Sequence, residues 1–240
     1  MALAWLEHDC HSPFPPIEDA LEDGLLAVGG DLSTHRLVNA YRHGIFPWFN
    51  ENDPILWWAP DPRMVLFTDE VKISKSLRKT LQKSAMSVTI DTAFNQVMRS
   101  CAVPRHYQTE VTDSGTWIHP NMIEAYTQLH QQGNAHSVEV WHDDHLVGGL
   151  YGVAIGRAFF GESMFSIMRD SSKIALVALC QQLQRWQFPL IDCQIYSEHL
   201  ASMGAKMIKR AEFVTYLDTY CEQPLAATSW QLDDDLPLTL

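Results

Sequence analysis

The chain has 240 residues, of which 46% are hydrophobic and 19% are charged. This composition is typical of a folded globular protein with one large domain or two small ones, and it excludes disordered and fibrous chains. Asp and Glu number 29 against 17 Lys and Arg, so the formal net charge is −12. That balance argues against a protein that coats nucleic acid over its whole surface, although it leaves room for a local basic patch.

The cysteines and the N-terminus indicate a cellular compartment. Five cysteines are widely spaced without a CxxC pair, which favours reduced thiols over a disulfide framework. The N-terminal segment has no basic region and reaches Glu7 and Asp9 early, unlike an export signal. The longest weakly polar stretch, residues 146–156, is about half of the roughly 20 residues that a spanning helix needs. We therefore expect a cytoplasmic chain with no membrane partner.

Residues 1–62 are rich in Pro, Gly and Trp, and we interpret them as a small N-terminal domain. Only one helix fits there, at residues 33–43, with Ser33 as its N-cap and Gly44 as its stop. The aromatic side chains of this part need burial or a partner surface. We expect the domain to end near Pro62 and to pack on a larger one, residues 63–240.

A cationic segment follows at residues 71–83. The four lysines share one helical face by spacings of three and four, and Ile73, Leu77 and Leu81 form a second, apolar face. One arginine adds a fifth cation, so the set is Lys72, Lys75, Arg78, Lys79 and Lys83. Five of 17 basic residues within 13 positions of an acidic chain indicate either a solvated charged face or a footprint for a polyanion.

The remaining elements are expected in the order β-β-β-α-β-α-β, preceded by two helices. The helices before the strands are predicted at residues 91–101 and 120–132, separated by a polar loop that carries Trp117. The later strands are predicted at residues 136–141, 146–155, 157–165, 189–195 and 213–217, and the later helices at 173–186 and 198–203. This order indicates an α+β domain with a central mixed sheet. The tail after Glu222 is expected to fray.

Two strands carry candidate polar groups. Strict alternation places Asp192 and Gln194 on one face of their strand, and Ile191, Cys193 and Ile195 on the other. Burying an Asp there is costly unless it is hydrogen-bonded. The residue is either a structural carboxylate or one that orients and polarises an adjacent amide or nucleophile.

The second candidate is Glu162, in the segment FGESMF. Alternation places Phe160, Glu162 and Met164 on one side, and Gly161 leaves room for a ligand near the backbone. A lone Glu among apolar residues is either an ion-pair partner or the polar group of a ligand pocket. The sequence contains no HExxH, P-loop or GxSxG motif, and we expect no metal site.

In combination, several blocks resemble the bacterial leucyl/phenylalanyl-tRNA–protein transferases. The blocks run in family order between residues 24 and 216 and include GLLAVGGDLS, AYRHGIFPWF, DPILWWAPDPR, GTWI, LVGGLYGVAIG, FGESMFS, SKIALVAL and LIDCQI. The resemblance implies a small N-terminal domain and a larger domain with an acetyltransferase-type (GNAT) fold. The loop before the central helix, FSIMRDSSK, has no glycine, which disfavours acyl-CoA binding.

The resemblance also implies the reaction. Leu or Phe, and Met less readily, would move from aminoacyl-tRNA to proteins that begin with Arg or Lys, marking them for N-end rule degradation. It implies a monomer that needs no metal or organic cofactor. Two alternatives from other classes stay open: an acyl-CoA N-acetyltransferase and a non-catalytic tRNA-binding module.

Matching positions imply the site residues. Asp192 and Gln194 would form a relay at the attacking amine, with Glu162 near the reaction centre. A pocket for the donor side chain would be lined by Leu150, Phe159, Gly161, Met164, Leu176, Leu179, Leu183 and Ile191. Trp48 and Trp117 would lie beside the terminal adenosine of the tRNA. Its acceptor stem would meet Lys72, Lys75, Arg78, Lys79 and Lys83.

Overall fold

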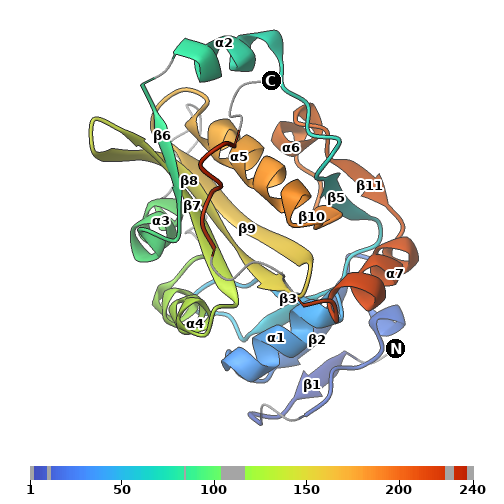
Figure 1. The fold of residues 1–240 in the computed structure, drawn as a ribbon. Coiled ribbons are helices and arrows are strands. Elements are labelled where there is room, and N and C mark those ends of the chain that lie inside the picture. The colour runs from blue at the N-terminus through green and yellow to red at the C-terminus, as the bar shows by residue number, and fades with distance from the viewer. Residues whose placement is uncertain (1–2, 10–11, 84, 104–116, 225–229, 237–240) are drawn as a thin grey trace.

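The computed structural model describes residues 3–9, 12–83, 85–103, 117–224 and 230–236, and two sheets organise them (Figure 1). The smaller sheet has the strand order β1-β2-β4-β3 and lies entirely in the first 58 residues. Its strands are β1 (Ala4–Leu6), β2 (Leu25–Gly29), β3 (Phe46–Pro47) and β4 (Leu56–Trp58). This part also contains a short 3₁₀ turn, η1 (Ile17–Asp19), and the helix α1 (Thr34–Arg42). Ser33 caps α1 as expected, its hydroxyl accepting from the Arg36 amide at 3.3 Å.

The larger sheet has the strand order β11-β5-β10-β9-β8-β7-β6. Its strands are β5 (Arg63–Phe67), β6 (Ser87–Ile90), β7 (Ala135–His142), β8 (His145–Ile155), β9 (Ala158–Ser166), β10 (Leu190–Gln194) and β11 (Lys206–Ile208). Strands β9 and β10 pair in parallel and the other neighbours pair antiparallel. The expected α+β class with a central mixed sheet is therefore confirmed, and the predicted meander corresponds to β7, β8 and β9.

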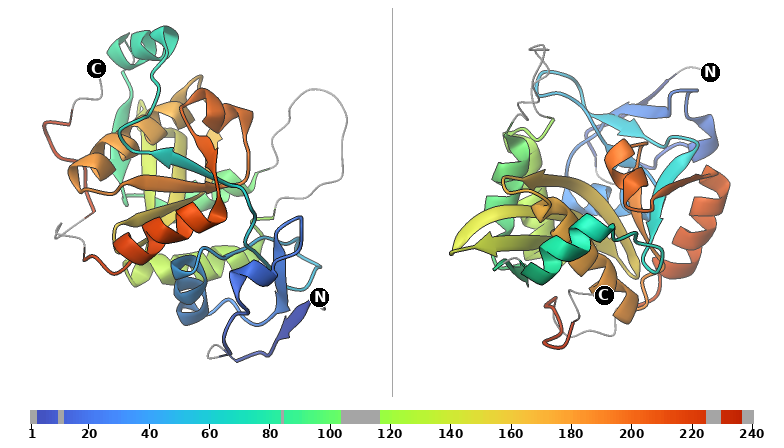
Figure 2. Two further views of the ribbon diagram at one scale, coloured as in Figure 1. Left: turned by 90° about the vertical axis from the view of Figure 1, so that its right-hand side faces the viewer. Right: turned by 90° about the horizontal axis from the view of Figure 1, so that it is seen from above.

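Helices cover both faces of the larger sheet (Figures 1 and 2). On one face α5 (Ser171–Arg185) packs over β7 and β8 with α2 (Lys75–Lys83) beside it, forming an apolar core. On the other face lie α3 (Phe94–Ala102) and α4 (Pro120–Gln131), whose core continues into α1 and the smaller sheet. The helices α6 (Glu198–Ser202) and α7 (Arg210–Tyr220) follow β10 and β11. No helix in the described part has a stretch long and apolar enough to cross a membrane.

The strand predicted at residues 213–217 is wrong, because this segment lies inside α7. Phe213 and Leu217 are buried, and their spacing of four satisfies both a strand and a helix. Thr215 separates the two cases, since a strand would bury it on the same face and the structure exposes it. The last strand is instead β11, directly before the helix.

The tail also differs from its expected fraying, because residues 230–236 pack against β7 of the larger sheet and against its covering helix α5. The Trp230 ring stacks on the His136 ring with centroids 3.5 Å apart, and Leu232 contacts the same core. Arg185 of α5 pairs with Asp233 at 2.8 Å. An indole and an ion pair therefore hold a segment whose acidic composition suggested solvent exposure.

Candidate active site

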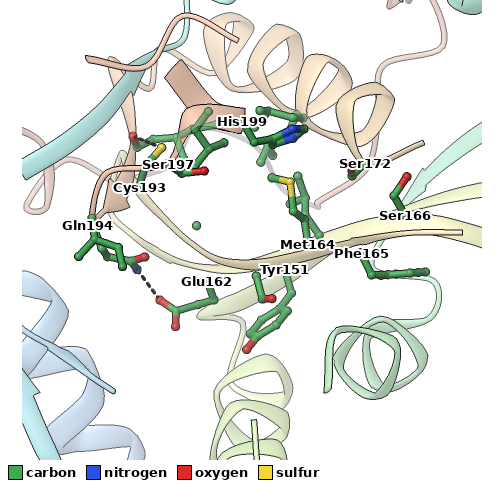
Figure 3. Close-up of a pocket in the computed structure, with 18 of the residues that line it drawn as sticks. Tyr151, Glu162, Met164, Phe165, Ser166, Ser172, Cys193, Gln194, Ser197 and His199 are labelled. Atoms are coloured by element: carbon green, nitrogen blue, oxygen red, sulfur yellow. Dashed lines mark hydrogen bonds between the residues drawn. The ribbon is translucent and has the colours of Figure 1, made fainter. Parts of the chain in front are cut away.

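The site begins where two neighbouring strands separate. Strands β9 and β10 pair only at Phe159–Ile191 and Phe160–Asp192. The residues that follow on both strands line a cavity of about 860 Å³. Figure 3 shows Glu162 and Gln194 facing each other across this gap from the two separate strands. A cleft between diverging strands gives polar groups from both strands access to one ligand.

Each of the two strands has a β-bulge at this point. On β9, Gly161 pairs with Gly152 and Ser163 with Tyr151, which leaves Glu162 as the additional residue. On β10 the register shifts between Asp192 and Gln194. Bulges bend a strand and redirect its side chains, and they are frequent beside active sites.

The bulges overturn both alternation predictions. Phe160 packs in the core with α3 and α4, whereas Met164 packs toward α5, so the two do not share a side. Gln194 lines the cavity together with Ile191 and Cys193, from which strict alternation would separate it. Gln194 also has a positive φ of 60°, which takes its backbone out of the extended conformation.

Three side chains donate hydrogen bonds to the Glu162 carboxylate. Its Oε1 accepts from the Tyr41 hydroxyl at 2.8 Å and from Gln194 Nε2 at 3.0 Å. Its Oε2 accepts from the Tyr126 hydroxyl at 3.1 Å, and the two tyrosine hydroxyls also contact each other. The donors come from α1, β10 and α4, so the smaller and larger parts of the chain meet at this carboxylate.

Burial governs the ionisation of this cluster. Desolvation raises the pKa of Glu162 to about 7, against the opposing effect of the hydrogen bonds from Tyr41, Tyr126 and Gln194. The negative charge of Asp192 adds to the increase. Burial also raises the pKa of both tyrosines well above the usual value of 10. The tyrosines therefore remain donors at neutral pH, while Glu162 exchanges its proton in the physiological range.

Asp192 lies behind the cavity rather than in its wall. Its carboxylate is fully buried and binds Arg63 through two hydrogen bonds, of 2.8 and 2.7 Å. It also accepts the backbone N–H of Gln194 at 3.0 Å. Asp192 thus contacts the Gln194 backbone, and the Gln194 side-chain amide binds Glu162.

The cavity brings together most of the residues proposed for the donor pocket. Its walls include Leu150, Phe159, Gly161, Met164, Leu176, Leu179 and Ile191. Leu183 is completely buried in the α5 core and is absent from the wall. The apolar part of the cavity is therefore formed by β8, β9, β10 and α5, and Glu162 and Gln194 supply its polar part.

Aromatic side chains border the same cavity. Trp48 and Trp117 both line it, and Trp48 is 41% exposed. The Trp58 indole N–H donates to the Trp48 carbonyl at 2.7 Å and its ring lies 5.7 Å from the Trp48 ring. Tyr196, directly after the bulged strand, is 61% exposed and also lines the cavity. A planar group at the entrance would find aromatic surfaces on more than one side.

The basic residues lie on α2, outside the cavity wall. Lys75, Arg78 and Lys79 are exposed there, while Lys72 precedes the helix and Lys83 is its last residue, with a side chain outside the described part. The opposite face of the helix packs on the core through Leu77, as predicted. The Thr80 hydroxyl donates to Asp170 at 3.2 Å, which ties α2 to the turn between β9 and α5.

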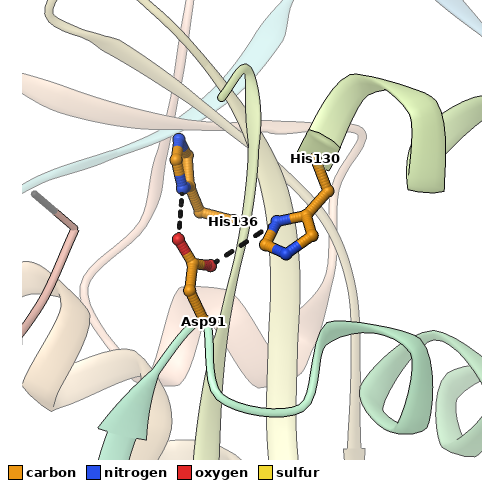
Figure 4. A group of neighbouring side chains, drawn as sticks. All are labelled: Asp91, His130 and His136. Carbon is orange, nitrogen blue, oxygen red and sulfur yellow. Dashed lines mark hydrogen bonds and ion pairs between the residues drawn. The ribbon is translucent and has the colours of Figure 1, made fainter. Parts of the chain in front are cut away.

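Only one group of metal-ligating side chains occurs within the described ranges, formed by Asp91, His130 and His136 (Figure 4). Their ligand atoms lie within 4.8 Å of one another. However, His136 Nδ1 hydrogen-bonds Asp91 at 2.7 Å, and His130 Nδ1 lies 2.8 Å from the Ala135 carbonyl. A metal would have to replace these bonds, so the arrangement fits a hydrogen-bond network better than a metal centre.

Three residues of the site have no role in the sequence-based predictions. Tyr41 and Arg63 lie inside blocks that carried the family resemblance, AYRHGIFPWF and DPILWWAPDPR, and this was their only signal. Tyr126 lies in the middle of α4 with no distinguishing pattern around it. A residue that positions another residue shows no characteristic spacing in the sequence by which it could be recognised.

Comparisons with known proteins agree on one family. A family model described as leucyl/phenylalanyl-tRNA protein transferase matches residues 65–218, and the model of its N-terminal domain matches residues 30–61. Proteins named leucyl/phenylalanyl-tRNA–protein transferase are similar along nearly the whole chain. That of Nitrosomonas eutropha is 58% identical, covering 94% of this chain and 95% of its own. That of Nitrosospira multiformis is 54% identical, covering 97% and 98%.

Solved structures give weaker likenesses. The C-terminal domain of a lysylphosphatidylglycerol synthetase from Agrobacterium fabrum has a TM-score of 0.38 at 12% identity, covering 73% of this chain and 56% of that one. A GCN5-related N-acetyltransferase from Kribbella flavida has a TM-score of 0.31 at 11% identity, covering 70% and 58%. Neither likeness is strong enough to support a functional argument.

Proposed function

Because this chain belongs to the leucyl/phenylalanyl-tRNA–protein transferase family and is thus an aminoacyltransferase, we propose that it acts on N-terminal Arg or Lys. The amino acid transferred from tRNA is Leu or Phe, and Met less readily. The product enters N-end rule degradation. The observation that carries the proposal is the cavity between β9 and β10, which joins an apolar wall to the hydrogen-bonded pair Glu162 and Gln194.

The apolar wall suits the donor side chain. Leu150, Met164, Leu176 and Leu179 present unbranched or γ-branched surfaces around a space that can take an isobutyl or a benzyl group. Discrimination between these two is limited, since a change of one methylene in an apolar pocket is worth about 1–3 kcal/mol. The wall therefore supports a preference for large apolar donors as a class.

The polar part suits the attacking amine. The reaction is aminolysis of an ester, and an α-amino group with an ordinary pKa near 8 has a useful neutral fraction at cellular pH. Gln194 directs Nε2 to Glu162, so its carbonyl oxygen can accept a hydrogen from the amine. A Glu162 pKa of about 7 suits a group that takes up a proton at neutral pH, and its negative form attracts a cationic first residue. Positioning and proton handling of this kind need no metal or organic cofactor.

We assign the tRNA contacts from the positions of the aromatic and basic side chains at and beside the cavity. Trp48 and Trp117 border the cavity, where the terminal adenosine would follow the donor amino acid. The exposed Lys75, Arg78 and Lys79 on α2 would meet phosphates of the acceptor stem. The hydrogen bond between Thr80 and Asp170 fixes this helix to the turn beside the cavity residues Ser166 and Ile167.

The organisation of the chain forms part of the proposal. We place the domain boundary near Pro62, between the last strand of the smaller sheet and β5, and the two matching family models also meet there. We assign the protein to the cytoplasm, where charged tRNA is available, and we expect a monomer.

The test is transfer of radiolabelled Leu from Leu-tRNA to two peptides that differ only in an N-terminal Arg or Ala. We expect labelled product from the Arg peptide alone, and none from the same peptide with an acetylated N-terminus. Equal labelling of both peptides would overturn the acceptor rule. No labelling by folded protein that still binds tRNA would leave the binding-module alternative, and binding of acetyl-CoA would favour the N-acetyltransferase.

A further inference from the structure

The buried ion pair of Arg63 and Asp192 lies behind the cavity, and both oxygens of the Asp192 carboxylate accept hydrogen bonds from the protein. Asp192 Oδ1 accepts from Arg63 Nε at 2.8 Å and from the Gln194 backbone N–H at 3.0 Å. Asp192 Oδ2 accepts from Arg63 Nη2 at 2.7 Å. Both charged side chains are at most 1% exposed. Two parallel hydrogen bonds between a planar guanidinium and a carboxylate fix the orientation of both groups.

Aromatic rings hold the guanidinium from two other parts of the chain. The Arg63 Cζ atom lies 4.8 Å from the ring centroid of Phe46 in β3 and 4.9 Å from that of Phe213 in α7. A guanidinium stacked on aromatic faces is restricted in position and only weakly hydrated. Arg63 is therefore fixed by β5, by the smaller sheet and by α7 together.

The Gln194 backbone needs such support. A positive φ of 60° is unfavourable for a residue with a side chain, and the bulge at Gln194 interrupts the regular ladder of β10. The hydrogen bond from its N–H to Asp192 stabilises this conformation. The side chain then extends toward the other strand and reaches Glu162 at 3.0 Å.

We propose that Arg63 is a positioning residue of the transfer reaction. It fixes the Asp192 carboxylate, which in turn accepts the Gln194 backbone N–H and holds that backbone in its bulged conformation. The inference rests on the proposed function and deepens it. In this arrangement Asp192 takes no proton from the substrate, because both its oxygens face donors of the protein and it lines no part of the cavity. Gln194 and Glu162 are the groups that reach the reacting atoms.

The decisive test is the double variant Arg63→Gln/Asp192→Asn, compared with both single variants. Each single variant leaves one buried charge without its partner, so we expect kcat for Leu transfer to fall at least 100-fold. The double variant has no charge at either position, and its new carboxamide oxygen at position 192 can still accept the Gln194 N–H. We expect its kcat to recover at least tenfold over both single variants, with KM for Leu-tRNA within threefold of wild type.

A control is the ion pair of the buried Arg36 with the partly exposed Asp31, which lines no part of the cavity. Removing it with Arg36→Gln/Asp31→Asn reports the general cost of losing an ion pair away from the cavity, and we expect kcat to change less than threefold. A folded double variant at Arg63 and Asp192 that stays as inactive as Asp192→Asn would overturn the proposal, because the carboxylate charge itself would then be needed.

The variant Arg63→Lys keeps the proposal testable if the others do not fold. Lysine preserves the charge but lacks the planar pair of donors, so we expect kcat to fall about tenfold with KM unchanged. Full activity of Arg63→Lys would contradict the positioning role. Wild-type protein that transfers no Leu would instead refute the proposed function, so the two failures are distinguishable.

Discussion

Two glutamates of the larger sheet, Glu139 and Glu162, each accept several hydrogen bonds, and they differ in which groups donate to them. Glu139 on β7 is fully buried and accepts from the hydroxyls of Thr89 and Thr92 at 2.6 and 2.9 Å and from that of Ser137. The backbone N–H groups of Thr92 and Ala93 also point to it, both at 3.4 Å. This carboxylate closes the turn between β6 and α3 onto β7, and it lines no part of the cavity found on the neighbouring strands.

Glu162 on β9 has fewer donors, all of them side chains, and it borders the cavity. The number of hydrogen bonds therefore does not identify the carboxylate that we propose as functional, since Glu139 has more. The distinguishing feature is the bulge that turns Glu162 toward the cavity, where burial raises its pKa to about 7. A carboxylate whose donors lie mainly in one turn stabilises that turn, whereas one that borders a cavity can act on a ligand.

The largest expected effect is a difference in transfer activity between variants at Glu162 and at Glu139. Glu162→Gln keeps an oxygen that can accept from the Gln194 amide but loses the negative charge and the group that titrates near pH 7, so we expect kcat to fall roughly 100-fold to 10,000-fold. Glu139→Gln is the matched control, with kcat within threefold of wild type for the folded fraction. Single-turnover transfer of labelled Leu measures both. A similar loss in both variants would show that the comparison does not distinguish structural from catalytic carboxylates.

The second expected effect is on stability, and here the larger loss is expected at Glu139 rather than at Glu162. Glu139→Ala leaves several donors at the turn after β6 without an acceptor, and each buried unsatisfied group costs about 1–3 kcal/mol. We expect a loss of about 3 kcal/mol in the free energy of unfolding, measured by urea denaturation. A loss below roughly 0.5 kcal/mol would mean that water replaces the carboxylate without penalty.

Much of the architecture follows from local pattern. The meander of β7 to β9, the helix α5 and the capped helix α1 are predicted from alternation, helical spacing and a serine cap, because each depends on interactions within one element or hairpin. The short strands β1 to β4 have no such pattern, since three of the four have two or three residues. Their existence depends on pairing between segments distant in sequence.

The site is harder to predict because it departs from regular structure. Glu162 and Gln194 are recognisable as polar groups in apolar strands, but a bulge cannot be derived from alternation, and it reverses which face a side chain occupies. Arg63 and Asp192 are 129 positions apart, so their pairing is a property of the assembled sheet. Sequence reasoning thus identifies the groups that we propose for the chemistry better than the groups that position them.

A third, smaller effect concerns the pH dependence of stability. Burial holds the pKa of Glu162 at about 7 in the folded state, against an ordinary value of 4.5. Between these values the folded protein binds more protons than the unfolded chain, so the free energy of unfolding falls as pH rises. The stabilisation is fully present below pH 4.5 and is lost as pH rises through 7. We expect about 1–2 kcal/mol after allowing for partial exposure of the side chain.

Urea denaturation at several pH values, for wild type and Glu162→Gln, measures this contribution by difference. The variant has no titrating group at the position, so its stability should decline less over the same pH interval. Identical pH dependence of the two proteins would show that Glu162 has an ordinary pKa in the folded protein.

The smallest expected effect comes from removing one hydrogen-bond donor of Glu162, the Tyr41 hydroxyl. The hydrogen bond from Tyr41 opposes the increase in the pKa of Glu162, so Tyr41→Phe should raise that pKa above 7. A hydrogen bond worth about 0.5–1.5 kcal/mol corresponds to a shift of roughly half a unit to one unit. The carboxyl ¹³C signal of Glu162, assigned by its loss in Glu162→Gln, gives the titration midpoint directly. A midpoint that is unchanged or lower would contradict the donor role of Tyr41.

Tyr151→Phe is the matched control for this titration. The Tyr151 hydroxyl is buried without a hydrogen-bond partner among the described residues, and its ring packs 5.8 Å from that of Tyr126. Removing it deletes a phenol oxygen in the same region without removing a donor to Glu162, so the midpoint should stay in place. A shift in Tyr41→Phe alone would establish that donors from separate elements set the ionisation of Glu162.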